Sequence, residues 1–502
     1  MKTGKLAGAL AALFFVLALA GPARADHAAL EQEGLAKESR LDYDGAFDAY
    51  AAALRAAIAE AKGERREAGL AAAEVYVFKL AFLAERTARW KDLGEALAEA
   101  RKAVLPPTLD ARAAWYQSRA ALASADVPRA RKILEPLGFL TRFAIAGPFE
   151  NDRGGGYGTA YEPEQGPIDL AARYAGKGRE IGWRIPPQDA FLGEVDLDAM
   201  IRPNDECLAY ALTYVKWEGG PHTAALRLGS DEGAKAWWND ALVLARDVNR
   251  TLELDQDAVP IVLRKGWNRL LLKVTERKGA WAFLARITEP DGAPLAQPLA
   301  IEPRVAIADA RVEAEAKGAP ETPVKVSRGA IDYYEALEKS GKATAQDLFQ
   351  LGYVYYRRKA HDENAHPDRE AFKAAVALDP KSSVYHAYLS FVSAATGEFS
   401  VNREENARRA ELERALELDP QSARVALILA EYYLRSMRNP EKAETFCDRA
   451  LAVAPRSIDA LLLKAELQGR QGFGGYARDL VFKLEKDPAA QRSPAALGRI
   501  AG

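Results

Sequence analysis

The sequence predicts a multidomain α+β protein in which two blocks of paired helices flank one antiparallel β-sandwich. In two Ala-rich stretches, at 27–138 and 344–487, apolar residues recur at the spacing of amphipathic helices. Between 140 and 288 the pattern changes to short apolar runs, several of them alternating, as half-buried strands require. The length of 502 residues leaves room for three or four such domains.

The first 25 residues have the features of a secretory signal peptide. Two lysines supply a positive start, and an apolar run follows from Leu6 to Ala20. The small residues Ala23 and Ala25 suit signal peptidase, so we expect cleavage after Ala25 and a bacterial periplasmic or secreted protein. The run is shorter than the roughly 20 residues of a membrane-spanning helix, so we expect no stable membrane insertion after cleavage.

The charge of the chain argues against one class of partner, and its cysteines argue against a disulfide. The formal net charge of -2 argues against nucleic acid as a partner, because binding to it calls for a strongly basic face. Cys207 and Cys447 lie far apart, each in an apolar pattern. We expect two buried free thiols rather than a disulfide.

The helical stretches contain an internal repeat, which is clearest at 423–455. Large, small and aromatic residues fall at the places where two antiparallel helices must pack closely: Leu429, Ala430, Tyr433, Ala443, Cys447, Ala450 and Pro455. Small side chains allow the backbones to approach, and the proline ends the second helix. This pattern resembles the tetratricopeptide repeat, whose period is about 34 residues. Weaker copies in phase predict repeat blocks at 26–138 and 341–490.

The resemblance implies an α-solenoid whose concave face, lined by the first helix of each pair, binds peptides or protein partners. By helical phase, that groove would be lined by aromatic and charged residues: Phe349, Tyr353, Tyr356, Arg357, Arg424, Glu431 and Arg435. Aromatic and Arg side chains concentrate binding energy at interfaces. An equally weighted alternative is that Tyr353 and Tyr356 pack against the neighbouring repeat.

The segment 139–300 should form the β-sandwich. Expected strands are 140–146, ended by Gly147-Pro148, and then 208–217, 224–229, 234–238, 241–245, 259–263, 268–275 and 281–288. Asn239-Asp240 should form a tight hairpin, since both residues tolerate positive φ. Trp217, Trp238, Trp267 and Trp281 suit a sandwich core better than a sugar-stacking surface.

The stretches 228–240 and 263–274 resemble galactose-binding-like and protective-antigen-type jelly-roll modules. In lectin-like members two adjacent acids hold calcium, and Asp231-Glu232 stands at the matching place. Further acids and amides give a candidate calcium or ligand cluster of Asp231, Glu232, Asn239, Asp240, Asp247, Asp255 and Asp257. The competing interpretation is ordinary turn chemistry, which also favours Asp and Asn.

The sequence lacks the metalloprotease, nucleophile-elbow and phosphate-loop motifs, which indicates a non-catalytic protein without a firm metal site. A linker and helix at 301–340 and a terminal stub at 491–502 complete the predicted organisation. We expect a scaffold for a protein partner, with the sandwich as spacer or ligand module. The alternatives are a glycan-binding accessory protein, an enzyme with its site between sandwich and helices, and, by resemblance of module order, part of a larger protein carrying a transglutaminase-like domain.

Overall fold

The structure of the protein is a computed structural model that describes residues 26–304, 320, 322–359, 365–393, 401–487 and 490–491. The expected signal at 1–25 and nearly all of the expected stub at 491–502 lie outside the described residues. Within the described ranges, no helix combines the length and the apolar character that crossing a bilayer requires.

The N-terminal helices form three hairpins, α2 (His27–Ser39) with α3 (Tyr43–Glu60), α4 (Arg66–Thr87) with α5 (Trp90–Ala100), and α6 (Pro107–Ala123) with α7 (Val127–Leu134). The first pair depends on a small residue, because a Cβ on Gly34 would stand 2.6 Å from the Tyr50 ring. Helix α4 is buried on all sides rather than along one stripe, since it contacts α3, α5, α6 and two C-terminal helices.

The C-terminal helices begin with α9 (Ala330–Lys339) and continue as four stacked hairpins. These are α10 (Ala345–Arg358) with α11 (Pro367–Leu378), α12 (Ser383–Val392) with α13 (Val401–Leu418), α14 (Ala423–Arg435) with α15 (Pro440–Val453), and α16 (Ile458–Arg470) with α17 (Gly474–Glu485). The predicted contact residues Leu429, Ala430, Ala443 and Cys447 are all fully buried between α14 and α15. The expected close approach of paired helices is therefore confirmed.

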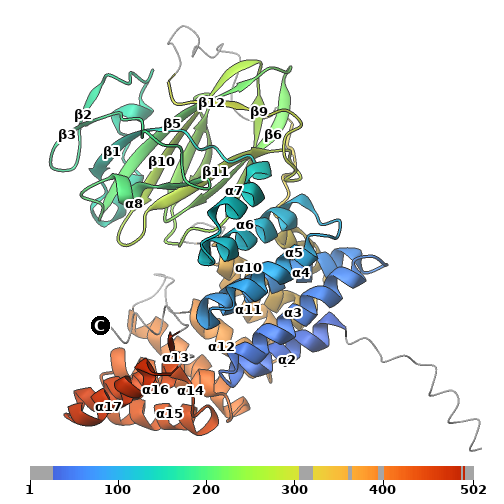
Figure 1. The fold of residues 1–502 in the computed structure, drawn as a ribbon, viewed down its shortest axis with the longest axis vertical. Helices are drawn as coiled ribbons and strands as arrows, with labels where there is room; N and C mark the ends of the chain where they lie inside the picture. Colours follow the sequence, from blue (N-terminus) through green and yellow to red (C-terminus); the bar gives the residue numbers. More distant parts are fainter. Residues whose placement is uncertain are drawn as a thin grey trace, which may run out of the picture.

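The two helical blocks pack on each other and form one array (Figure 1). A single cluster of buried apolar side chains contains residues from both 35–137 and 330–392. Helix α4 contacts α9 and α10, and α2 contacts α14. The sheets are thus inserted into a helical array that is discontinuous in sequence, an arrangement that local periodicity did not reveal.

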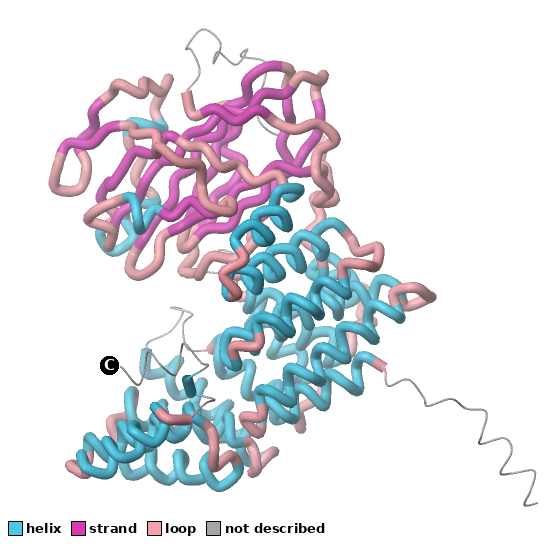
Figure 2. Tube along the Cα trace, in the orientation of Figure 1, coloured by secondary structure: helices cyan, strands magenta, loops and turns pink. Residues whose placement is uncertain are grey.

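The sheets lie together at one end of the molecule (Figure 2). The larger sheet has the order β1 (Ala144–Glu150), β5 (Cys207–Trp217), β10 (Gly266–Glu276), β7 (Ala234–Trp238) and β8 (Ala241–Arg246), with β12 (Ala300–Glu302) also paired to β5. The smaller sheet has the order β4 (Glu194–Asp196), β11 (Ala282–Thr288), β6 (His222–Ser230) and β9 (Asp257–Leu263). All these pairings are antiparallel.

A shared core holds the two sheets together. It contains Trp217 and Trp238 from the larger sheet and Phe283 from the smaller one, together with Trp281 just before β11. The prediction that these tryptophans are core residues is confirmed, whereas Trp267 is only half-buried, on the outer face of the larger sheet. That face is covered by the segment that carries the hairpin β2 (Arg173–Ala175) and β3 (Glu180–Gly182).

Seven of the expected strands agree with the structure to within two residues at each end. The expected hairpin is also confirmed, because Asn239 and Asp240 have φ of 47° and 68° and join paired residues of β7 and β8. The first strand is a correction: β1 begins at Ala144 rather than at 140, and it runs to Glu150 through Gly147-Pro148, where we expected it to end. The proline has no N–H to donate, so the ladder shifts register there and then resumes.

Candidate functional site at the helix–sheet junction

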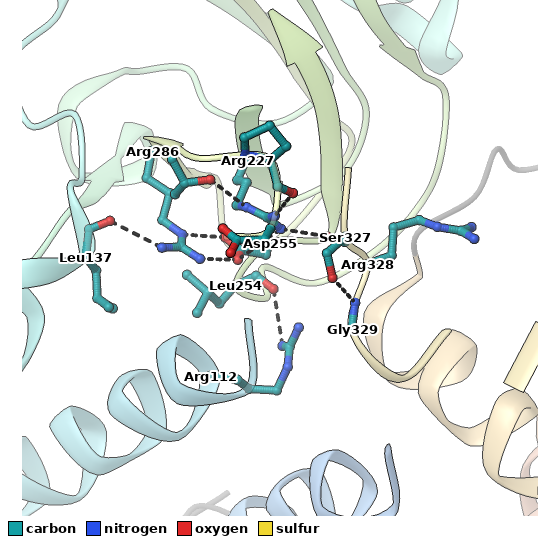
Figure 3. A network of polar contacts seen from close by, with 12 residues as sticks. Arg112, Leu137, Arg227, Leu254, Asp255, Arg286, Ser327, Arg328 and Gly329 are labelled. Carbon is teal, nitrogen blue, oxygen red and sulfur yellow. Dashed lines mark hydrogen bonds and ion pairs between the residues drawn. The ribbon is translucent and has the colours of Figure 1, made fainter. Parts of the chain in front are cut away.

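The loop between β8 and β9, at 247–256, lies between the smaller sheet and the helical array. At its centre the Asp255 carboxylate accepts bonds from Arg286, at 2.8 Å from Nε and 2.5 Å from Nη2 (Figure 3). Arg227 Nη1 lies 3.7 Å from the same carboxylate. Arg286 is on β11 and Arg227 on β6, so two neighbouring strands aim their arginines at one acid, and all three side chains are buried.

The N-terminal helices are hydrogen-bonded to the same loop through Arg112 on α6. Its Nε donates to Glu74 at 3.1 Å, and its Nη1 donates to the Leu254 carbonyl at 3.2 Å. Glu74 also accepts the Ala330 N–H at 2.9 Å, which fixes the start of α9. On the next turn of α6, Tyr116 donates to Glu253 of the loop at 2.5 Å.

The C-terminal repeats bind the loop at the end of α10. Gln256 Nε2 donates to the Arg358 carbonyl at 2.9 Å, and Arg250 Nη1 donates to the Lys359 carbonyl at 3.1 Å. In return, Arg358 donates to the carbonyl oxygens of Asp255 and Arg328. One ten-residue loop is therefore hydrogen-bonded to the N-terminal helices, the smaller sheet and the first C-terminal repeat.

The charged groups of the junction stabilise the contact between the sheets and the helices. Burial alone would raise the pKa of Asp255, but Arg286 and Arg227 keep it well below its ordinary value. Burial and the nearby Arg112 lower the pKa of Arg358 to about 10. Glu74, Glu253 and Asp255 each use both carboxylate oxygens in hydrogen bonds or ion pairs within the cluster, so all three acids hold the junction together.

The residues of the expected calcium cluster do not converge. Asp231 and Glu232 precede β7, whereas Asn239 and Asp240 follow it, so the two pairs lie at opposite ends of that strand. Asp255 is paired with Arg286, and Asp257 is paired with Arg250 and Arg246. Asp240 is paired with Arg269, and Asp247 is exposed just after β8. In the part of the chain that the structure describes, no three His, Cys, Asp or Glu residues are arranged to hold a metal ion.

Sequence reasoning missed a buried acid beside Asp231. Glu276, at the end of β10, is fully buried, and neither of its carboxylate oxygens has a hydrogen-bond partner among the described residues. Burial, together with the charges of Glu232 and Asp231, raises the pKa of Glu276 to about 8. Burial and Glu232 likewise raise the pKa of Asp231 to about 7. The alternating pattern of apolar residues ended the expected strand at 275, just before Glu276. An acid at the end of a strand is usually expected to be exposed to solvent.

The face that we expected to bind a partner is largely occupied by the chain's own N-terminal helices. Phe349 and Tyr353 are buried in the common core, and Arg357 lies over the rings of Phe78 and Phe82 of α4. Tyr356 and Glu431 are half-buried, whereas Arg435 is exposed and pairs with Glu466. Tyr353 thus packs, as the alternative interpretation held, against both the neighbouring Tyr388 and the N-terminal block.

A second buried network explains why Arg424 is not free. Its Nη1 lies 2.5 Å from Glu38 of α2, and Glu38 is also 2.9 Å from Lys79 of α4 and accepts the Tyr50 hydroxyl at 2.6 Å. Burial opposes ionisation of Glu38, but Lys79 and Arg424 lower its pKa to about 2. A charged Lys79 in mid-helix could not be recognised as buried from its position in the sequence.

The two cysteines are free and buried, as expected. Burial raises the pKa of each thiol to about 12, so neither is a thiolate near neutral pH.

No protein-family model matches the sequence, and no curated protein matches it. Among solved structures, the chain is similar to MamA, with 23% sequence identity, 34% of this chain and 86% of that chain covered, and a TM-score of 0.25. It is also similar to TTC0263, a thermophilic TPR protein of Thermus thermophilus, with 22% sequence identity, 34% of this chain and 89% of that chain covered, and a TM-score of 0.27. A third similar structure is yeast Tom70, with 12% sequence identity, 94% of this chain and 76% of that chain covered, and a TM-score of 0.26. At TM-scores this low, these similarities carry no argument. The contacts within the chain show stacked helical hairpins with small residues buried between the paired helices.

Proposed function

We propose that this protein is an exported, non-catalytic bacterial scaffold that binds a protein partner through its helical array. The junction at Asp255 carries this proposal. A buried ion cluster fixes the orientation of what it joins, because breaking any one pair would leave a charge stranded in a low dielectric. The sheets are then a rigid spacer, held at a fixed position relative to the surface that receives the partner.

A photo-crosslinking experiment in bacterial cells tests the proposal. A photoreactive amino acid would replace Arg435 or Tyr356 on the array, and Leu242 on the exposed edge of β8 serves as the control position. We expect one defined protein adduct from the array positions and none from Leu242. Adducts from Leu242 alone, or from no position, would contradict a scaffold that works through its helices.

Export is tested separately by N-terminal sequencing of the protein from a periplasmic fraction. We expect the mature chain to begin at Asp26, whose side chain already caps α2 by accepting the Ala29 N–H at 2.8 Å. A chain that stays in the cytoplasm with residues 1–25 attached would overturn the exported assignment without touching the partner proposal.

A second candidate function concerns the turn at Asp231-Glu232. Among the described residues, the two buried acids Asp231 and Glu276 form no ion pair, which favours a cation or ligand module of the galactose-binding-like type. Calcium titration monitored by the melting temperature tests it, with Glu276→Gln as the comparison. A calcium-dependent rise in the melting temperature that disappears in Glu276→Gln, followed by binding on a glycan array, would favour a glycan-binding accessory protein. No rise at millimolar calcium would leave the spacer role.

A further inference from the structure

A shallow hollow opens on the side of the sandwich where the edge strands of its two sheets lie. β1 is the edge of the larger sheet, and β4 is the edge of the smaller one. The apolar part of the lining comes from the start of β1, from β4, from the loop 185–190 and from the end of α8 (Leu197–Met200): Phe143, Ile145, Ile185, Pro186, Val195 and Met200. Phe191 directly follows that loop and is 52% exposed. The hollow therefore belongs to the sheets and not to the helical array.

A proline explains why the sandwich is not closed at this point. Arg184 pairs with Ile145 of β1, and the two residues exchange backbone N–H···O bonds of 2.9 and 2.8 Å. If the pairing continued, Pro186 would stand opposite Phe143, but proline has no N–H to donate. The loop therefore leaves the edge of β1, and Ile185 stays 36% exposed at the mouth of the hollow.

Two arginines beside the hollow have no acidic partner among the described residues. Arg184 donates to the carbonyl oxygen of Met200, and Arg179 donates to the carbonyl oxygen of Arg202 at 2.8 Å. Both Arg179 and Arg184 are exposed. Partial burial and the positive charge of Arg179 lower the pKa of Arg184, and no described acid offsets them. In a chain whose formal net charge is -2, these two arginines form a local excess of positive charge.

The acid in the lining of the hollow is already paired. Asp189 lies 3.3 Å from Arg142 and accepts the Thr141 hydroxyl at 3.4 Å. Arg142 also lies 3.1 Å from Glu302 of β12. Arg142, Arg179 and Arg184 together outnumber the two acids by one positive charge. That charge lies on the side of Arg184, where an anion would meet no competing carboxylate of the described chain.

From these observations we propose that the hollow receives an acidic segment of a protein partner, with one aliphatic side chain on its apolar lining and an adjacent carboxylate on Arg184 and Arg179. Guanidinium groups bind carboxylates through charge-assisted hydrogen bonds. An apolar contact beside such a pair excludes water from it, as in the centre of protein interfaces. An anionic membrane does not suit this shape, because a bilayer is contacted by protruding apolar and cationic groups. The inference does not depend on the proposed function, because it concerns a different surface.

Peptide display on the full chain tests the hollow. A library of random peptides is selected against the parent chain and against Arg179→Glu/Arg184→Glu. We expect the parent chain to enrich peptides in which Asp or Glu stands next to Leu, Ile or Val, and the variant not to enrich them. An enriched peptide labelled with fluorescein should bind the variant about tenfold more weakly or worse in fluorescence polarisation. Ile185→Asp, which places a carboxylate at the mouth of the hollow, should cause a similar loss.

A matched control reverses two charges elsewhere. Lys62→Glu/Lys265→Glu changes two exposed residues that do not line the hollow, and it should bind the peptide like the parent chain. Equal binding to the parent chain and to Arg179→Glu/Arg184→Glu would overturn the proposal, and so would a selection without acidic peptides. Binding of the variant's parent to phosphatidylglycerol vesicles in place of peptides, lost in the variant, would also overturn it in favour of a membrane.

Hydrogen exchange on the parent chain decides the question if the variants fail to fold. The enriched peptide should slow amide exchange at 141–145 and 184–190, which border the hollow. Slower exchange confined to the helical array would place the peptide there and would contradict the proposal.

Discussion

At the scale of residues, the molecule uses buried charge in two ways. Asp255 and Glu38 are each surrounded by cations, which hold their pKa values below the ordinary range. Glu276 and Asp231 are instead buried beside each other and Glu232, and their pKa values are raised. The first pair stabilises the fold as carboxylates, whereas burial and mutual repulsion favour the protonated forms of the second pair.

Glu276→Gln should stabilise the protein above neutral pH. Folding raises the pKa of Glu276 from 4.5 to about 8, so the folded state binds an extra proton, and stability falls as the pH rises between these values. The amide imitates the protonated acid and removes that loss. By thermal denaturation, we expect a higher melting temperature than the parent chain at a pH near the raised pKa, and nearly the same one at a pH near the ordinary value. Equal gains at both pH values would mean that Glu276 is not protonated on folding.

Asp255→Asn should destabilise the chain strongly. It leaves Arg286 and Arg227 buried without their acid, a change that typically lowers the free energy of unfolding by about 3–5 kcal/mol. Urea denaturation measures the change. The control Asp240→Asn removes an acid that is paired to Arg269 but 65% exposed, and it should stay within about 1 kcal/mol of the parent chain. Similar effects of the two substitutions would contradict a structural role for the junction.

At the scale of elements, paired helices depend on small residues at their closest approach. A Cβ on Gly352 of α10 would stand 2.8 Å from the Phe372 ring of α11. In the first turn of α17, by contrast, Gly475 has nothing within 4 Å of that position. The two glycines offer a matched comparison within one type of hairpin.

Gly352→Ala should therefore lower the free energy of unfolding by about 1–3 kcal/mol, because the added methyl forces α10 and α11 apart. Gly475→Ala should be neutral or stabilising by up to about 1 kcal/mol, since alanine restricts the unfolded chain and favours helix. Chemical denaturation of both variants checks the difference in sign. A neutral Gly352→Ala would show that the repeat contact is looser than the structure indicates.

Much at this scale could be predicted from the sequence, because periodicity is local. Helical and alternating patterns located the hairpins and seven strands, and Asn239-Asp240 located a turn. The short strands β2, β3, β4 and β12 could not be found, since three residues are too few to show a period. The candidate sites were harder to predict, because the burial of Asp255 or Lys79 depends on segments that are distant in sequence. The sequence pattern around an acid in a loop is also the same whether the acid binds calcium, water or an arginine.

At the scale of the whole molecule, the N-terminal helices, the C-terminal repeats up to α12 and the sheets form one body around the 247–256 loop. Phe349 and Tyr353 of α10 share a core with α4, so neither helical block has a complete core alone. The sequence predicted two blocks because nothing in a repeat pattern states which faces of separate blocks will meet.

Residues 26–138 expressed alone should consequently fail to fold stably. Their core lacks the side chains of α9, α10 and α12, and Glu74, Lys79 and Arg112 would be left without their distant partners. Circular dichroism and thermal melting should show weak helicity without a cooperative transition, whereas the mature chain melts cooperatively. A well-folded fragment would show that the N-terminal block is an independent domain.

Because the sheets are inserted into the helical array, the array cannot fold completely until the C-terminal helices have been synthesised. Lys79 bonds to Tyr388 and Glu38 to Arg424, partners that are 309 and 386 positions apart. Such long sequence separations slow folding, and during synthesis the apolar faces of the early helices wait for most of the polypeptide to arrive. A nascent chain of this kind remains a substrate for chaperones until late in its synthesis.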